Sequence, residues 1–188
     1  MGARKQMKHT DWNPPQVGAL YIGIDPGEVT GIAAVSYWGE LAGVLAYRPK
    51  THSPVQMYNA LLGWLHGTRL SQLSLTWERP TIRGQEMNKA GSLITTGYRA
   101  GLAVGMVQYF FERHGLVVTC QDVVPYDWKG QTPKYQHNRW VRKSLSDEER
   151  RRIDEAGFTK AESDDILDAI GIAKWAANKH RRLRQGGP

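Results

Sequence analysis

The sequence contains almost no cysteine and no long hydrophobic run. Its 188 residues include one cysteine, Cys120, so no disulfide can form within the chain, and we expect a reducing compartment, the cytoplasm. No apolar stretch approaches the roughly 18 residues that cross a bilayer, and the N-terminus carries no apolar signal core, so we expect no membrane partner. The six histidines are scattered, which excludes a zinc cluster. No P-loop is present either, and we expect no small-molecule cofactor.

Positive charge is what the sequence has in excess. Lys and Arg total 25 against 18 Asp and Glu, which gives a formal net charge of +7. Such a balance indicates a polyanionic partner such as nucleic acid, although many basic proteins bind none. The length suits one folded domain with its own core. We expect a flexible basic arm at residues 1–17, a single folded domain at 18–180 and a basic tail at 181–188.

The spacing of apolar residues predicts a mixed α/β fold. Strands are expected at 19–24, 31–37, 41–47, 73–77 and 116–120. Helices are expected at 54–67, 92–114 and 162–180, the last with Ser163 as its N-cap. Three consecutive strands followed by alternating helices and strands predict a mixed five-stranded sheet flanked by helices.

Two carboxylates directly follow predicted strands. Asp25 directly follows the first strand and precedes Pro26-Gly27, and Glu78 directly follows strand 73–77. One interpretation is a pair of acidic groups held at strand ends, where Gly27 would let a metal or phosphate approach the backbone. The alternative is structural: Asp-Pro-Gly is common turn chemistry, and Glu78 would be a solvated strand end paired with Arg79.

The last predicted helix carries two acidic residues on its apolar face. At about 100° per residue, Asp165 and Asp168 share that face with Ala169 and Ile172, so both should point inward. Two dry carboxylates about 4 Å apart repel by roughly 4 kcal/mol at an effective dielectric of about 20. A cation should therefore lie between them, and Mg²⁺ or Mn²⁺ would suit oxygen ligands. Neutralising Asp168 would then leave folding intact or raise the stability of the metal-free protein.

Together these motifs resemble those of the RuvC-type Holliday junction resolvases of the ribonuclease H-like superfamily. The matching segments are Gly23-Ile24-Asp25-Pro26-Gly27 with Thr30-Gly31, Glu78 after a strand, and Asp165-x-x-Asp168-Ala169 on a final helix. The Glu78-Arg79-Pro80 segment is similar to the corresponding segment of phage-type members. A phage-type member would be located in the cytoplasm of the host cell. The resemblance implies a homodimer that acts on four-way junction DNA.

The resemblance also implies a ribonuclease H-like fold and a site with two Mg²⁺ ions, for which Mn²⁺ would substitute. The implied metal ligands are Asp25, Glu78, Asp165 and Asp168. Two ions held by carboxylates can activate a water and stabilise the leaving 3′ oxygen at phosphorus. Asp25 would bridge both ions, and Asp165 would either bind one or orient the water. The expected activity is that of a Mg²⁺-dependent endodeoxyribonuclease that makes paired, symmetric nicks.

Basic residues near these carboxylates are the candidates for DNA contact. By resemblance, Lys129 after Trp128 corresponds to a lysine that touches a phosphate or the transition state, and it joins the catalytic set. For a second such lysine, Lys134, Arg139 and Lys143 stay open. The basic and aromatic residues of 129–152 suit phosphate contact and stacking, with an ordinary solvated helix pair as the alternative.

The loop after Glu78 adds further candidates for DNA contact, namely Arg79, Arg83 and Lys89. Bacterial family members carry an aromatic wedge three positions after the glutamate, and this chain has Thr81 there. The wedge is therefore absent or moved, and Arg83, Met87 and Lys89 are possible substitutes.

Three glycines recur every four residues in the predicted helix 92–114, at Gly97, Gly101 and Gly105. A glycine inside a helix costs about 1 kcal/mol relative to alanine, so a very close neighbour is expected, either the sheet or the same helix of a partner chain. Two other functions stay open: a ribonuclease of the same fold that processes structured RNA, and a non-catalytic nucleic-acid-binding protein on an inactive nuclease fold.

Overall fold

The computed structural model describes residues 6–10, 17–65, 69–79 and 90–186. The five strands are β1 (Val17–Asp25), β2 (Thr30–Ser36), β3 (Leu41–Tyr47), β4 (Arg69–Glu78) and β5 (Val118–Val123). The helices are α1 (Pro54–Leu65), α2 (Ala90–Arg113), α3 (Pro125–Lys129), α4 (Lys134–Lys143), α5 (Asp147–Glu155) and α6 (Lys160–Arg184). The strands form one sheet in the order β3-β2-β1-β4-β5, which confirms the expected mixed five-stranded sheet.

The sheet has an antiparallel half and a parallel half. β1 pairs antiparallel with β2, and β2 with β3, through short connections. β1 pairs parallel with β4, and β4 with β5, after the longer connections that parallel neighbours need. Ile24 lies opposite Trp77 in this register, so the residues that follow them, Asp25 and Glu78, emerge side by side at one edge of the sheet.

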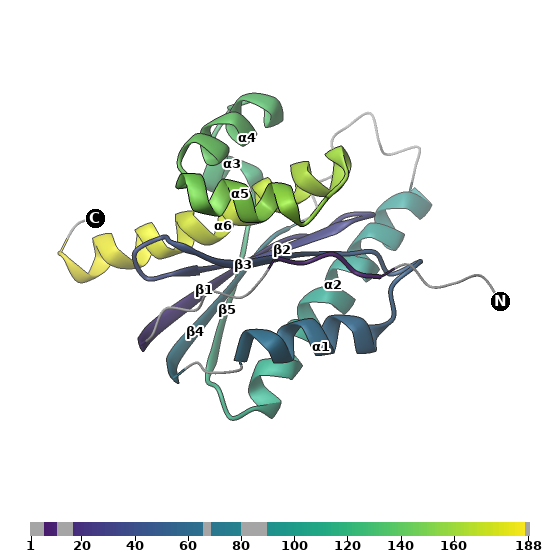
Figure 1. Cartoon of the computed structure of the whole chain (residues 1–188), viewed down its shortest axis with the longest axis horizontal. Helices are drawn as coiled ribbons and strands as arrows, with labels where there is room; N and C mark the ends of the chain where they lie inside the picture. The colour runs from purple at the N-terminus through teal and green to yellow at the C-terminus, as the bar shows by residue number, and fades with distance from the viewer. Residues whose placement is uncertain (1–5, 11–16, 66–68, 80–89, 187–188) are drawn as a thin grey trace.

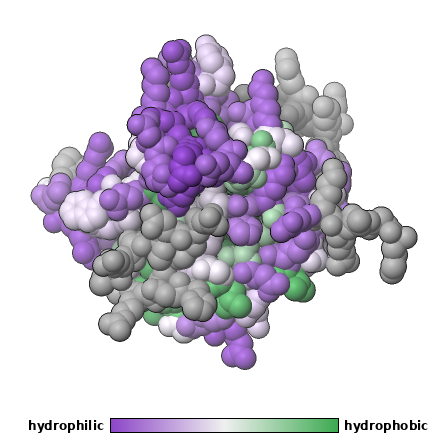
Figure 2. All heavy atoms as spheres, viewed as in Figure 1, coloured by the Kyte–Doolittle hydropathy of each residue, from purple (hydrophilic) through white to green (hydrophobic). Residues whose placement is uncertain are grey.

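Helices cover both faces of the sheet and give the molecule three layers (Figure 1). Because strand side chains alternate between faces, Leu20, Ile22 and Ile24 pack in the core on the side of α1 and α2. The intervening Tyr21 and, on β2, Ala33 pack in the second core against α6. Figure 2 shows hydrophilic side chains gathered over α5 and hydrophobic ones reaching the surface near α1. Within the described part, no helix is long and apolar enough to span a membrane.

Two glycines in the strands let α6 lie directly on the sheet. A Cβ at Gly23 would come within 2.1 Å of the carbonyl oxygen of Ala169, and one at Gly31 within 2.2 Å of that of Asp165. Both separations are far below van der Waals contact, so any side chain here would push the helix away. The absence of a side chain at these two positions fixes the height of α6 above β1 and β2.

The structure corrects the expected start of the last helix. α6 begins at Lys160 with Thr159 as its N-cap, not at Ser163. The side chain of Thr159 accepts a hydrogen bond from the Glu162 N–H, and the Glu162 side chain accepts one from the Thr159 N–H. This reciprocal capping box satisfies two otherwise unpaired helix donors, whereas Ser163 lies within the helix.

The expected flexible arm differs from the structure at residues 6–10. Lys8 and Thr10 exchange backbone hydrogen bonds with Ala46 and Val44 of β3, and Met7 is buried in the core. At the other end, α6 continues to Arg184, so part of the expected basic tail is helical.

The glycines of α2 do not face the sheet. Gly97, Gly101 and Gly105 are exposed, and a Cβ at any of them would meet nothing within 4 Å. The sheet is therefore excluded as their close neighbour, and a partner chain stays a prediction.

Candidate functional site

Four carboxylates meet at the sheet edge where β1 and β4 end. Asp25 and Glu78 are the last residues of these adjacent parallel strands. Asp165 and Asp168 lie one turn apart in the first half of α6, which the strand glycines bring down onto β1 and β2. Asp168 is almost fully buried, with 2% of its side chain exposed. The predicted inward orientation of this pair is confirmed.

A lysine ammonium group occupies the space between these acidic side chains. Lys134, the first residue of α4, places Nζ 2.9 Å from Oδ2 of Asp168 and 3.0 Å from Oδ1 of Asp165. The same Nζ is 3.9 Å from Oδ2 of Asp25. The sequence indicated a cation between Asp165 and Asp168, and Lys134 is the cation that the chain itself supplies there.

Glu78 is held by α3 instead of by its neighbour in sequence. Trp128 Nε1 donates a hydrogen bond to Oε2 of Glu78 at 3.0 Å, and Lys129 Nζ lies 3.4 Å from the same oxygen. Lys129 also lies 4.0 Å from Asp168. Arg79 turns away and pairs with Asp122 at 3.3 Å. The alternative in which Arg79 neutralises Glu78 is therefore wrong.

His137 is a member of this cluster that the sequence reasoning missed. It lies one turn after Lys134 on α4, and its Nδ1 faces Oδ1 of Asp168 at 3.6 Å. Both atoms are buried without a hydrogen-bond partner. The ring stacks edge-on against Trp128, and a Cβ at Gly171 would lie 2.6 Å from it. The spacing of Lys134 and His137 on one helical face was the available signal.

The charges of the cluster shift the pKa values of its carboxyls in opposite directions. Burial, reinforced by the neighbouring Asp168 and Glu78, raises the pKa of Asp25 well above its usual value. Burial also opposes ionisation of Asp168, but His137, Lys134 and Lys129 outweigh it and lower the pKa of that carboxyl. Asp25 is thus the acidic group least compensated by the lysines, and Asp168 the most.

The donor chemistry of this site suits a hard divalent cation. All four acidic residues offer carboxylate oxygens, the ligands that Mg²⁺ and Mn²⁺ prefer, and Oδ1 of buried Asp168 has no hydrogen-bond donor. Over the described ranges, however, no three histidine, cysteine or carboxylate side chains stand ready to hold a metal ion as they are. The acidic groups are arranged around Lys134.

The remaining DNA-contact candidates lie farther from the carboxylates. Arg139 and Lys143 are exposed on α4, and Lys143 is nine residues, or about 13 Å of helix, beyond Lys134. Of the three alternatives for the second lysine, the structure brings Lys134 to the site. Arg83 and Lys89, together with Thr81 and Met87, lie outside the described residues.

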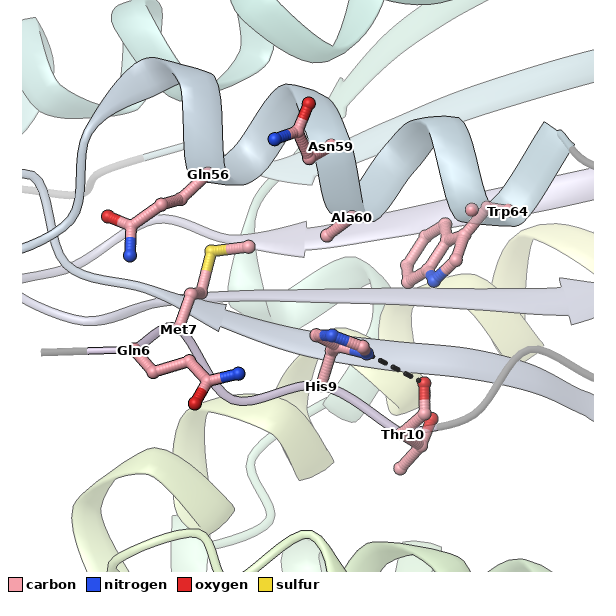
Figure 3. A pocket seen from close by; sticks show the side chains of 9 residues that line it. Gln6, Met7, His9, Thr10, Gln56, Asn59, Ala60 and Trp64 are labelled. Atoms are coloured by element: carbon pink, nitrogen blue, oxygen red, sulfur yellow. Dashed lines mark hydrogen bonds between the residues drawn. The ribbon is translucent and has the colours of Figure 1, made fainter.

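A separate cavity on the opposite side of the sheet lacks comparable chemistry. It has a volume of about 300 Å³ and lies between residues 6–10 and α1. Figure 3 shows Met7, His9 and Trp64 among its lining residues. No acidic or basic side chain other than His9 lines it among the described residues, so the carboxylate cluster remains the candidate site.

Comparison with known proteins places this geometry in a known fold. No family model and no curated protein sequence matches the chain. Among solved structures, Thermus thermophilus RuvC in complex with a Holliday junction substrate aligns with a TM-score of 0.54 and 21% identity, over 89% of this chain and 96% of that one. The chain has the RuvC fold. Thermus thermophilus RuvC alone aligns over the same shares at 21% identity, with a TM-score of 0.50.

A third RuvC-like structure, the yeast mitochondrial Holliday junction resolvase Ydc2, aligns with a TM-score of 0.43 and 14% identity, over 92% of this chain and 84% of that one. The RuvC fold confirms the α/β architecture that the motifs predicted. The phage-type assignment stays a prediction.

Proposed function

We propose that the protein is a metal-dependent DNA endonuclease that resolves four-way junctions by paired, symmetric nicks. The observation that carries the proposal is the convergence of Asp25, Glu78, Asp165 and Asp168 around two lysine side chains at one edge of the sheet. The RuvC fold supports junction DNA as the substrate, because one aligned structure is a complex with that substrate. The net charge of +7 favours a polyanion.

Asp25 and Glu78 at the strand ends and Asp165 and Asp168 on α6 would hold the metal ions. When bound, two Mg²⁺ or Mn²⁺ ions would supply an activated water and stabilise the leaving 3′ oxygen. Trp128 and Lys129 fix the orientation of Glu78 before any ion arrives, since both contact its Oε2. His137 faces Asp168 and is placed to orient it in the same way.

Lys134 has to leave the carboxylates when metal is held there, because its ammonium group lies against three of the four. Nearly half of its side chain is exposed, and a lysine stem is long and flexible. Turned outward, Nζ would meet a backbone phosphate of bound DNA. Lys134 would therefore neutralise acidic groups in the free protein and contact the DNA when metal ions and substrate are bound.

Paired nicks on a two-fold symmetric junction require two sites, so we propose a homodimer. The exposed face of α2 is the candidate interface, because Gly97, Gly101 and Gly105 leave its backbone open to a close neighbour.

A cleavage assay tests the proposal. Four-way, Y-shaped and linear DNA, together with a structured RNA, would be incubated with the full chain in Mg²⁺ or Mn²⁺. We expect paired nicks on the four-way DNA, loss of at least about 100-fold in rate for Asp25→Asn and reduced cleavage for Lys134→Met. Lys143→Met, about 13 Å farther along the same helix, should reduce cleavage less than Lys134→Met.

Other outcomes would favour the alternatives. Cleavage of the RNA alone would support a ribonuclease of the same fold. Tight junction binding without cleavage of any substrate would support a non-catalytic binding protein.

A further inference from the structure

A groove of about 540 Å³ runs between α4 and α6, beside the carboxylate cluster. Trp128 and His137 form the wall that the groove shares with that cluster, since they face Glu78 and Asp168 on their other side. Farther along, the lining includes Trp140, Trp175 and Lys179. Among the residues that the structure describes, twelve line the groove; none of these is acidic and three, Lys174, Lys179 and Arg182, are basic.

Part of the aromatic and basic lining of the groove is exposed, whereas Trp128 is buried and Trp175 is half-buried. Trp140 has 53% of its surface exposed, so its ring can be reached from the groove. Lys179 Nζ lies 4.9 Å from the ring centre of Trp175, and both Lys179 and Arg182 are exposed. Lys174 serves a different purpose, because its Nζ donates to the Ser144 carbonyl oxygen at 3.0 Å and secures the end of α4.

We propose that this groove binds unpaired nucleotides of the DNA strand that enters the carboxylate site. Bases would stack on Trp140 and Trp175, and phosphates would lie against Lys179 and Arg182. Indoles interleaved with cations, without acidic residues, match the two surfaces of a single strand, which are flat bases and negative phosphates. This inference rests on the proposed function, for which it names the part of the substrate held outside the reacting site.

The length of the groove sets its reach along the strand. Lys179 follows Asp168 by eleven residues of α6, or about 16 Å along the helix axis. That distance corresponds to about five steps of a stacked strand at 3.4 Å each, and to fewer nucleotides if the strand is extended. The bound nucleotides would thus lie within a few positions of the cleaved phosphate, near the branch point, and the proposal requires base pairs there to open when the strand is bound.

Binding without metal tests the inference separately from catalysis. The full chain in EDTA would be titrated with a twelve-residue oligothymidine and with a four-way junction, and tryptophan fluorescence and affinity would be measured. We expect oligothymidine to quench the fluorescence, and Trp140→Ala combined with Trp175→Ala to remove most of that quenching and weaken binding roughly ten-fold or more. Lys179→Gln with Arg182→Gln should lower the salt slope of oligothymidine binding by about 1.4, since each phosphate contact to a single strand contributes about 0.7.

Trp38→Ala is the matched control. Trp38 is 68% exposed and has Arg181 at 6.0 Å from its ring centre, but it lies on the β2–β3 turn, outside the groove. Its removal should leave affinity unchanged. If the double tryptophan variant unfolds, Trp140→Ala alone and the two surface cation variants carry the test.

Unchanged affinity in the folded groove variants would overturn the inference, as would equal weakening by Trp38→Ala. A structured RNA would be titrated in the same way, and groove variants that weaken binding of this RNA but not of DNA would also overturn the inference. If the wild-type protein does not cleave DNA but the groove variants still weaken DNA binding, the result counts against the proposed function alone. If the wild-type protein cleaves junctions but the groove variants bind DNA as well as it does, the result counts against the groove alone.

Discussion

At the scale of single residues, the four carboxylates contribute unequally to the stability of the folded protein. The sequence reasoning assigned the repulsion to Asp168, but Lys134, Lys129 and His137 surround that side chain and lower its pKa. Asp25 has its nearest cation at 3.9 Å and a raised pKa. Relief of repulsion on neutralisation is therefore expected at Asp25 instead of Asp168.

We predict opposite effects of Asp25→Asn and Asp168→Asn on the stability of the metal-free protein at pH 7. Asp25→Asn should raise the melting temperature, because it removes a charge that the fold disfavours. Asp168→Asn should cost roughly 2 kcal/mol, because it weakens a charged contact with Lys134. Thermal unfolding in EDTA measures both, and a higher melting temperature for Asp168→Asn would contradict this assignment.

The contributions of Asp25 and Asp168 to the free energy of unfolding should depend on pH in opposite ways. The pKa of Asp25 is raised on folding, so its stabilising effect is present below its unfolded pKa, near 4, and is lost as the pH rises through the folded value. The pKa of Asp168 is lowered, so its stabilisation is present above that unfolded pKa and is lost as the pH falls through the folded value. Asp25→Asn should therefore raise stability most at the upper end of a series from pH 4 to pH 8.

At the scale of elements, the position of α6 decides whether the site exists. Gly31→Ala would place a Cβ about 2 Å from a backbone oxygen of Asp165, a clash that only movement of the helix can relieve. We predict destabilisation of at least about 1–3 kcal/mol and weaker metal binding, since Asp165 and Asp168 move with the helix. Urea unfolding and Mn²⁺ titration would measure these effects.

Gly63→Ala is the control for this change. Gly63 is exposed within α1, and a Cβ there meets nothing within 4 Å. The substitution should raise stability by about 1 kcal/mol through helix propensity and leave Mn²⁺ binding unchanged. Equal effects of the two alanines would mean that close contact at Gly31 does not position α6.

Periodicity and strand-end motifs predicted the elements that build the sheet and the carboxylates that they carry. Asp25 and Glu78 follow strands that are visible in the sequence, and the apolar face of α6 orients Asp165 and Asp168. The arrangement of α3 and α4 was not predictable in this way, because α3 is only five residues long and the amphipathic pattern of α4 does not say which element its buried face packs against. Only the folded chain places Lys134 between the carboxylates and His137 beside Asp168.

At the scale of the whole molecule, the net charge of +7 understates the basic character of the surface. Four of the 18 acidic residues lie in the site, where lysine side chains already contact them. Others are paired on α5, where Arg151 contacts Glu148 and Glu155. The two sides of the sheet also differ. Acidic and basic groups gather with α3 to α6, whereas the exposed residues of α2 whose side chains the structure describes are mainly glycine and tyrosine, together with Leu102, Glu112 and Arg113.

The exposed face of α2 is the candidate interface of the homodimer proposed above. Gly97, Gly101 and Gly105 lie there with Tyr98 and Tyr109, which are 71% and 64% exposed. If the glycines mark a close helix crossing, Gly101→Leu should convert a particle of twice 21.2 kDa into a monomer. The monomer should still bind one arm of a junction but nick it without symmetry, since paired nicks need both sites at once.

Sedimentation measures the mass, and sequencing gels of the two cleaved strands measure the symmetry of the nicks. Gly63→Leu is the control, because Gly63 is equally exposed on a helix but lies on α1; it should leave both mass and symmetry unchanged. If wild type and Gly101→Leu sediment alike as monomers, α2 is not an interface. Gly101→Leu should in that case raise stability, because leucine is a better helix former than glycine.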